Sequence, residues 1–179
     1  MKLRTALLPL LFLALFIGDA DARGRRRSAG TRYVSNGTFG LGLEVGGPTG
    51  LNGKYFLSDD GALNFGIGAE GYAYRYRGRN GLNLYLDYLW HPVSLVDADA
   101  FQLPFYIGLG GRIWSFDEDR YNDGFAFGIR VPIGIAFDFN NVPLDIFIQV
   151  TPTLDFYRDY YDSVGFWFDF SAGIRFWFN

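Results

Sequence analysis

The chain has 179 residues, a formal net charge of −3 and 20% aromatic residues, and it contains no cysteine. This length accommodates one domain, and the absence of cysteine excludes disulfide bonds and thiolate metal sites. Lysine occurs only at Lys2 and Lys54. Because soluble surfaces usually carry many lysines and glutamates, the scarcity of lysine suggests that much of this surface does not face water.

The first 22 residues have the pattern of a secretory signal peptide. A basic start is followed by an apolar stretch over residues 6–17, which is too short to cross a bilayer as a helix. Residues 20–22 read Ala-Asp-Ala, a typical cleavage site. We therefore expect residues 1–22 to be removed during export. An uncleaved anchor is the less favoured alternative.

Residues 23–37 form an Arg-rich segment. Its five arginines are interspersed with small and polar residues, a composition that cannot bury a core. We therefore predict a flexible N-terminal arm. It either contacts anionic phospholipid headgroups or another acidic partner, or serves only as a charged leader for secretion. From Tyr33 onward the chain carries 9 basic and 17 acidic residues. Because the chain is expected to be exported, we expect no nucleic acid partner.

Eight runs of alternating apolar and polar residues follow the arm, separated by turn signals. Alternation of this kind predicts β-strands, because successive side chains of a strand point to opposite faces. The runs cover approximately residues 38–45, 51–57, 62–75, 82–90, 101–114, 125–139, 144–156 and 164–178. Pro132 interrupts the sixth run. After the fourth run, we expect His91-Pro92 to start a longer connection that extends through Asp99.

The last run shows its two faces most clearly. From Val164 to Phe178 one parity carries eight apolar side chains, most of them aromatic, whereas the other carries small and charged residues together with Trp167 and Trp177. This pattern is typical of a β-barrel in a lipid bilayer, whose apolar side chains point outward. A soluble barrel would place its apolar face inside. The bulky apolar face and the glycine-rich polar face favour the membrane arrangement.

The sequence therefore predicts an all-β fold, an eight-stranded antiparallel up-and-down transmembrane β-barrel over residues 38–179. An even number of strands places both termini on the periplasmic side. The connections after the second, fourth and sixth runs then face the periplasm, and the other four face the outside.

Charged residues on the predicted inward faces point to a filled interior. An eight-stranded barrel is just wide enough to be filled by side chains, and buried charges must be paired or hydrogen-bonded. We predict an ion-pair network that plugs the barrel, with a narrow cation-preferring path for small solutes or ions as the alternative. The members of this network are Glu44, Lys54, Glu70, Asp87, Arg112, Arg130, Asp138, Asp145, Asp155, Asp169 and Arg175.

The predicted outer connections carry mixed charge and tyrosine. Tyrosine and arginine are enriched in binding surfaces, although tyrosine equally forms belts at the membrane interface. We expect a contact surface for an extracellular partner, whose identity the residues do not reveal. Its candidate residues are Arg75, Arg77, Arg79, Asp117, Glu118, Tyr121, Arg158, Tyr160 and Tyr161.

Motifs for catalysis and metal binding are sparse. His91 is the only histidine, and its position beside Pro92 indicates a turn residue. Ser94 lies nearby but has no G-x-S-x-G surroundings. The acidic residues between 117 and 123 lack EF-hand spacing, so a solvated loop is favoured over a weak calcium site. We expect no enzymatic activity, no cofactor and no metal. A lipid-modifying outer-membrane enzyme is the third-ranked function.

The signal ending at Ala22, the eight runs and the aromatic final strand resemble the small OmpA/OmpX-type bacterial outer-membrane β-barrels. Residues 47–57 are also similar to a stretch in other bacterial barrels of this size. The resemblance covers residues 38–179 and implies a location in the outer membrane, surrounded by its lipids. It also implies insertion by the outer-membrane assembly machinery, which recognises a C-terminal strand ending in an aromatic residue; here Phe178 is penultimate. The function favoured is a non-enzymatic structural or surface-interaction role.

Overall fold

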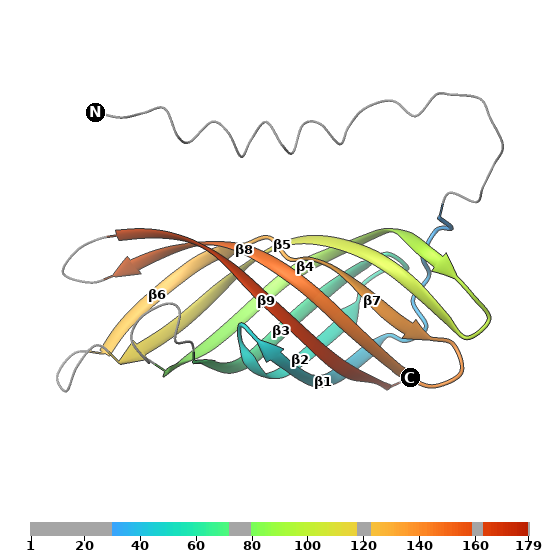
Figure 1. The fold of residues 1–179 in the computed structure, drawn as a ribbon, viewed down its shortest axis with the longest axis horizontal. Coiled ribbons are helices and arrows are strands. Elements are labelled where there is room, and N and C mark those ends of the chain that lie inside the picture. Colours follow the sequence, from blue (N-terminus) through green and yellow to red (C-terminus); the bar gives the residue numbers. More distant parts are fainter. Residues whose placement is uncertain (1–29, 72–79, 118–122, 159–162, 179) are drawn as a thin grey trace, which may run out of the picture.

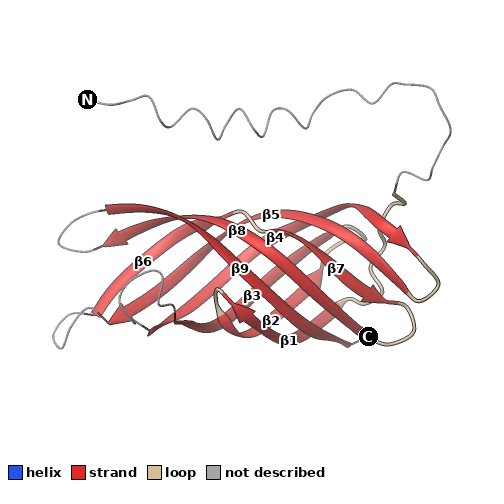
Figure 2. Cartoon of the chain, in the orientation of Figure 1, coloured by secondary structure: helices blue, strands red, loops and turns tan. Residues whose placement is uncertain are grey.

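The computed structural model describes residues 30–71, 80–117, 123–158 and 163–178. These residues form nine β-strands (Figure 2), and none of them belongs to a helix long and apolar enough to cross a membrane. The all-β class predicted from the alternation is confirmed. The strands are β1 (Phe39–Gly46), β2 (Thr49–Phe56), β3 (Gly61–Gly71), β4 (Asn80–Asp97), β5 (Phe101–Asp117), β6 (Asp123–Arg130), β7 (Ile133–Phe139), β8 (Leu144–Arg158) and β9 (Ser163–Phe178).

All nine strands belong to one antiparallel sheet that closes on itself (Figure 1). Strands β1 to β5 pair in chain order, β6 and β7 both lie between β5 and β8, and β9 follows β8. The ring is completed where β1 pairs with β9, from Phe39↔Phe178 to Gly46↔Ser171. Over this length the closure satisfies the backbone groups that an open sheet edge would expose.

The predicted sixth run, residues 125–139, is divided into β6 and β7. The division falls at Val131-Pro132, where proline cannot donate a ladder hydrogen bond. The break is nevertheless bonded on both sides: the Val131 amide donates to the Pro152 carbonyl, and the Gly108 amide donates to the Pro132 carbonyl. The two short strands together occupy the place predicted for one, so the structure has nine strands where eight were expected.

The prediction of a long connection beginning at His91 was wrong. Strand β4 continues to Asp97, with a register shift between Trp90 and Val93 that accommodates Pro92. Such a bulge adds a residue to one strand without ending the pairing. A proline in a central strand ends the pairing only where no bulge accommodates it. The sequence does not show whether such a bulge is present. For the other predicted runs whose two ends lie in the described part, each end of the run is within three residues of the corresponding end of the observed strand.

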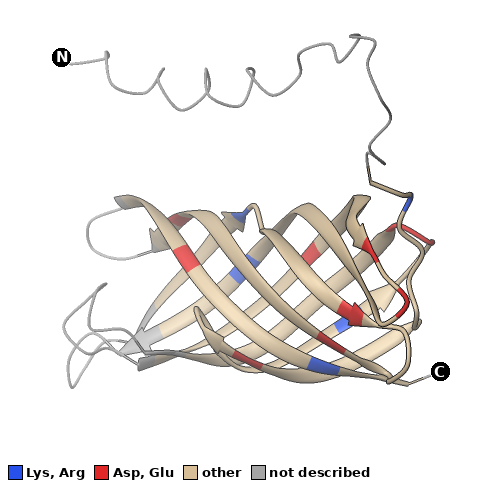
Figure 3. Ribbon diagram, turned by 45° about the vertical axis from the view of Figure 1, so that its right-hand side comes forward, with Lys and Arg blue, Asp and Glu red and all other residues tan. Residues whose placement is uncertain are grey.

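The two faces of the closed sheet are opposite in character. Large apolar side chains cover the outside, where Leu43 is 58% exposed and Phe170 is 70% exposed. Charged and amide side chains fill the inside, and charges occur along the whole length of the sheet (Figure 3). Three turns, at residues 57–60, 98–100 and 140–143, surround one end of the ring, here called the terminal mouth because the C-terminal strand ends there (Figure 1).

The segment before β1 also lies at the terminal mouth (Figure 1). Thr31 forms a β-bridge with Ser94, and the side chain of Tyr33 is only 1% exposed. This differs from the flexible arm predicted for residues 23–37, of which residues 23–29 lie outside the described part. A single buried tyrosine in an Arg- and Gly-rich segment produces no periodicity, so composition gives no sign of its burial.

Candidate functional site in the sheet interior

Ten of the eleven charged residues predicted to face inward have side chains that are at most 6% exposed. Glu70 lies in β3, but its side chain is outside the described part of the structure. Strand periodicity brings the ten together, because alternate residues of every strand point into the closed sheet. They are Glu44, Lys54, Asp87, Arg112, Arg130, Asp138, Asp145, Asp155, Asp169 and Arg175.

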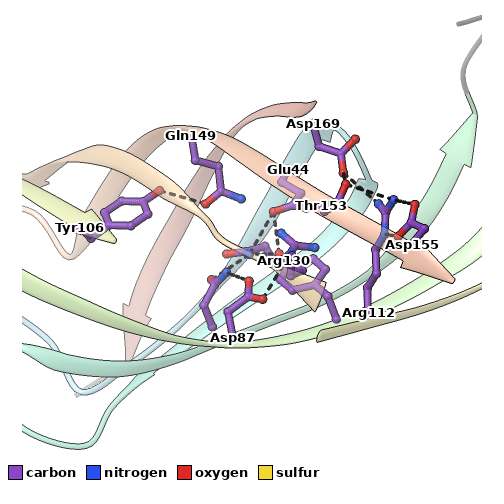
Figure 4. A network of polar contacts seen from close by, with 12 residues as sticks. Glu44, Asp87, Tyr106, Arg112, Arg130, Gln149, Thr153, Asp155 and Asp169 are labelled. Atoms are coloured by element: carbon purple, nitrogen blue, oxygen red, sulfur yellow. Dashed lines mark hydrogen bonds and ion pairs between the residues drawn. The ribbon is translucent and has the colours of Figure 1, made fainter. Parts of the chain in front are cut away.

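Arg112 links β5, β8 and β9 across the interior (Figure 4). Its Nε donates to Asp155 Oδ1 at 2.9 Å and its Nη2 donates to Asp155 Oδ2. Its Nη1 donates to Asp169 Oδ2, also at 2.9 Å. Thr153 donates a further hydrogen bond to Asp169. The bidentate contact with Asp155 is of the strongest kind that arginine makes. We call Arg112, Asp155 and Asp169 the Arg112 cluster.

Arg130 and its neighbours occupy the middle of the interior. Its Nε lies 3.1 Å from Asp87 Oδ1 as an ion pair without hydrogen-bond geometry, and its guanidinium lies 3.9 Å from the centre of the Tyr85 ring. The Tyr85 hydroxyl donates to Glu44 at 2.7 Å. Asn52 donates to the same carboxylate oxygen at 3.1 Å. Strands β1, β2, β4 and β6 are thereby connected across the interior.

A third arginine, Arg175, is held by Asp145. Its Nε and Nη2 donate to the two carboxylate oxygens at 2.9 and 2.8 Å. Its Nη1 donates to Asn52 at 3.0 Å, and its guanidinium lies over the Phe147 ring at 4.2 Å. Asn52 therefore connects this ion pair with the Glu44 carboxylate in one continuous set of contacts.

His91 faces the interior near the terminal mouth and is fully buried, which contradicts its prediction as a turn residue. Its Nδ1 lies 2.9 Å from the carbonyl oxygen of Asp60, and its Nε2 lies 2.7 Å from Lys54 Nζ. Since a carbonyl only accepts, Nδ1 carries the ring proton and Nε2 accepts from the lysine. The inward alternation Asn83, Tyr85, Asp87, Leu89 continues through position 91, and this was the sequence signal for its placement.

Tyr33 is a further interior residue that the sequence did not identify. Its hydroxyl donates to Asp138 Oδ2 at 2.8 Å. Its ring centre lies 5.4 Å from that of His91 and 5.9 Å from that of Phe56. Burial and the nearby Asp138 carboxylate raise the pKa of Tyr33 well above its usual value, so the phenol remains a donor at neutral pH.

The two candidates for catalysis, Ser94 and His91, are engaged in structural contacts, whereas the side chains of the acidic residues between 117 and 123 lie outside the described part. Ser94 donates to the carbonyl of Val96, and both ring nitrogens of His91 have the partners described above. Within the described ranges, no three His, Asp or Glu side chains are grouped so as to hold a metal ion.

The candidate outer-loop residues cannot be placed. Asp117 and Arg158 end strands β5 and β8, but their side chains are outside the described part. The remaining seven lie outside it entirely: Arg75, Arg77, Arg79, Glu118, Tyr121, Tyr160 and Tyr161.

Comparisons with known proteins find one solved structure with a similar fold and one family model that matches the sequence. The crystal structure of the N-terminal β-barrel domain of Pseudomonas aeruginosa OprF is similar, with a TM-score of 0.52 and 16% identity over 80% of this chain and 98% of that one. This supports an OmpA-like β-barrel fold. No curated protein matches the chain. The model of a family described as protein of unknown function, DUF3996, matches residues 32–179. Because this match covers most of the sequence, the chain belongs to the DUF3996 family.

Proposed function

We propose that this protein is a non-enzymatic outer-membrane β-barrel with a structural or surface-interaction role. In this proposal it is exported by its signal peptide, residues 1–22, and inserted by the outer-membrane assembly machinery through β9. The barrel has eight strand positions, one of them shared by β6 and β7, and it spans the membrane. The outer-loop residues predicted from the sequence would form the surface for an extracellular partner.

The observation that carries the proposal is that the apolar face of the sheet points outward and the charged face points inward, the opposite of a water-soluble barrel. Exposed leucine, isoleucine and phenylalanine side chains cover the outside of the sheet, whereas the interior holds three arginines with buried acidic partners. In water the exposed apolar surface would be unfavourable. In a bilayer the same arrangement is favourable, because lipid solvates the apolar side and the closed sheet satisfies the backbone.

The ion pairs support a plugged interior. The Arg112 cluster, the Arg130–Asp87 pair and the Arg175–Asp145 pair join residues from β4, β5, β6, β8 and β9. Arginine and aromatic side chains also fill the space between the walls, as the stacking of Arg130 on Tyr85 shows. An interior of this kind would stabilise the strand register and restrict the passage of solutes.

A narrow cation-preferring pore is the second candidate. Several buried polar atoms in the described part have no hydrogen-bond partner, among them Arg130 Nη1 and Nη2, Gln149 Nε2 and Ser171 Oγ. Buried groups of this kind usually bind water. Six buried carboxylates stand against four buried basic side chains in the described interior, so a hydrated path would prefer cations. No observation favours the third candidate, a lipid-modifying enzyme.

The first experiment is gel mobility of protein extracted from purified outer membranes, with and without boiling. A folded membrane barrel predicts a mobility difference, whereas a soluble periplasmic protein absent from that fraction would overturn the proposal. Conductance in a planar bilayer then separates the two candidates. A plugged barrel gives no steady conductance, and a pore gives small cation-selective steps that change in the Arg130→Met protein.

A further inference from the structure

Residues 30–37, here called the strap, run across the terminal mouth. At one side, the Ser94 amide of β4 donates to the Thr31 carbonyl at 2.9 Å, and the Thr31 hydroxyl donates to Asp97 at 3.1 Å. At the other side, Asn36 Nδ2 donates to Asn140 Oδ1 at 2.9 Å, in the turn between β7 and β8. The strap then enters β1. It therefore passes from one wall to another instead of following a single strand.

Tyr33, between these two attachments, reaches across the interior. Its hydroxyl bonds Asp138 of β7, and its ring contacts Phe56 of β2. In the closed ring, β2 and β7 are separated by β3, β4 and β5 in one direction and by β1, β9 and β8 in the other. They therefore lie on opposite walls. One side chain that touches both walls blocks the space between them.

Aromatic rings around Tyr33 complete this layer. Phe56 lies 5.7 Å from Trp177 and 5.1 Å from His91, and His91 lies 5.5 Å from Tyr106. These rings come from four different strands, and all are at most 6% exposed. The Lys54 ammonium lies beneath them, 4.9 Å from the Phe56 ring centre and 5.2 Å from that of Tyr106. The terminal mouth is therefore sealed by rings, whereas the middle of the interior is filled by ion pairs.

We infer that the strap is a displaceable stopper: when residues 30–37 leave the terminal mouth, Tyr33 leaves with them and the interior opens to solvent on that side. The wall strands are held by continuous ladders, but the strap is held by one β-bridge, a few side-chain hydrogen bonds and one ring. Its exposed ion pair, Arg32 with Asp59 at 3.9 Å, adds little. Segments with so few buried contacts open locally without unfolding the rest.

The inference depends on the closed barrel but not on its membrane location, so it is testable on refolded protein in detergent. Because the chain has no cysteine, a single introduced cysteine reports on one place. Ala136 is 1% exposed and lies one inward position deeper than Asp138 on β7. In the Ala136→Cys protein we expect a water-soluble maleimide to react slowly. Adding Tyr33→Ala should accelerate the reaction by about tenfold or more, as expected for local opening.

Matched variants keep this result interpretable. Tyr55→Ala removes an identical side chain from the outside of β2, where Tyr55 is 42% exposed, and should leave the reaction rate unchanged. Boiling-dependent mobility shows that each variant is folded. A folded Tyr33→Ala/Ala136→Cys protein whose thiol reacts no faster than that of Ala136→Cys alone would overturn the stopper. Loss of the mobility shift in every variant, including the parent, would instead refute the barrel.

A reversible lock tests the stopper without removing Tyr33. Thr31 and Ser94 are β-bridge partners, and the separation of about 5.5 Å between such Cα atoms suits a disulfide. In Thr31→Cys/Ser94→Cys/Ala136→Cys protein, labelling at position 136 is read by peptide mass spectrometry, and we expect it to be slower with the 31–94 disulfide formed than after its reduction, with Thr31→Cys/Ala136→Cys as control. Equal labelling rates at position 136 in the oxidised and reduced forms contradict a displaceable strap.

Discussion

The Arg112 cluster and the strap close the same interior in different ways. The Arg112 cluster uses side chains from β5, β8 and β9, so the ladders that form the wall also fix its geometry. The strap uses Tyr33 from a segment outside the sheet, attached at a few points. Burial alone therefore does not make a contact permanent. How firmly a buried side chain is held depends on how many contacts hold the backbone segment that carries it.

The largest effect is expected from breaking the Arg112 cluster. Arg112→Met leaves two buried carboxylates, Asp155 and Asp169, without the guanidinium that neutralises them. Breaking a buried ion pair by removing one partner costs about 3–5 kcal/mol. We expect the temperature at which the folded gel band disappears to fall sharply, and less so in Arg112→Met/Asp155→Leu. An unchanged transition in the single variant would show that this cluster contributes nothing to the wall.

A charge on the outside should have a somewhat smaller effect. Ile148 is the fifth of the 15 residues of β8, points outward and is 51% exposed. If this surface contacts lipid, Ile148→Arg should destabilise the membrane-inserted protein by up to about 4 kcal/mol, the cost at the bilayer midplane, measured by urea unfolding in vesicles. Thr38→Arg, at an exposed position just before β1, is the control. Equal effects of the two substitutions would contradict a lipid-facing position for Ile148.

The strap can be loosened without emptying its site. Tyr33→Phe keeps the ring but removes the hydrogen bond to the Asp138 carboxylate, and a bond to a charged group contributes about 1.5–3 kcal/mol. In the Ala136→Cys background we expect faster maleimide labelling, by less than with Tyr33→Ala, and an almost unchanged unfolding transition of the barrel. A fall in the barrel transition as large as that in Arg112→Met would show that the strap and the wall unfold together.

The hydrogen bond from Tyr33 to Asp138 also predicts that the attachment of the strap depends on pH. The pKa of Tyr33 is raised in the folded protein, so its contribution is fully present below the unfolded value of about 10 and is lost as the pH rises through the folded value. Labelling of the Ala136→Cys protein should therefore accelerate at strongly alkaline pH after correction for the reactivity of the thiol itself. Tyr33→Phe should abolish this additional acceleration, and its persistence would assign the effect to another group.

The smallest effect is expected at the exposed end of the strap. Arg32 and Asp59 are 3.9 Å apart and mostly exposed, and such pairs contribute between zero and about 1 kcal/mol. Asp59→Asn should change the labelling rate of the Ala136→Cys protein by less than about threefold. Adding about 0.5 M salt to the Ala136→Cys protein should have a similar small effect, because salt screens the pair. A large effect would show that this ion pair is the main contact holding the strap in the terminal mouth.

Strand periodicity alone predicted the all-β class and the inward direction of Glu44, Arg112 and Asp155. Each of these follows from the parity of one run, which is local information. The bulge in β4 was not predictable, because Pro92 is compatible with either a turn or a bulge until the neighbouring strand is placed. His91 was misassigned for that reason, although the parity of its run favoured an inward position.

Which residues of each strand face the interior could thus be predicted from the chain, because a strand alternates whatever its neighbours are. Their partners could not, since they depend on the register of the closed sheet: Arg112 meets Asp155 and Asp169 across 43 and 57 residues of chain. The burial of Tyr33, which carries no periodic signal, also depends on the tertiary structure. It requires a mouth that exists only once the ring has closed.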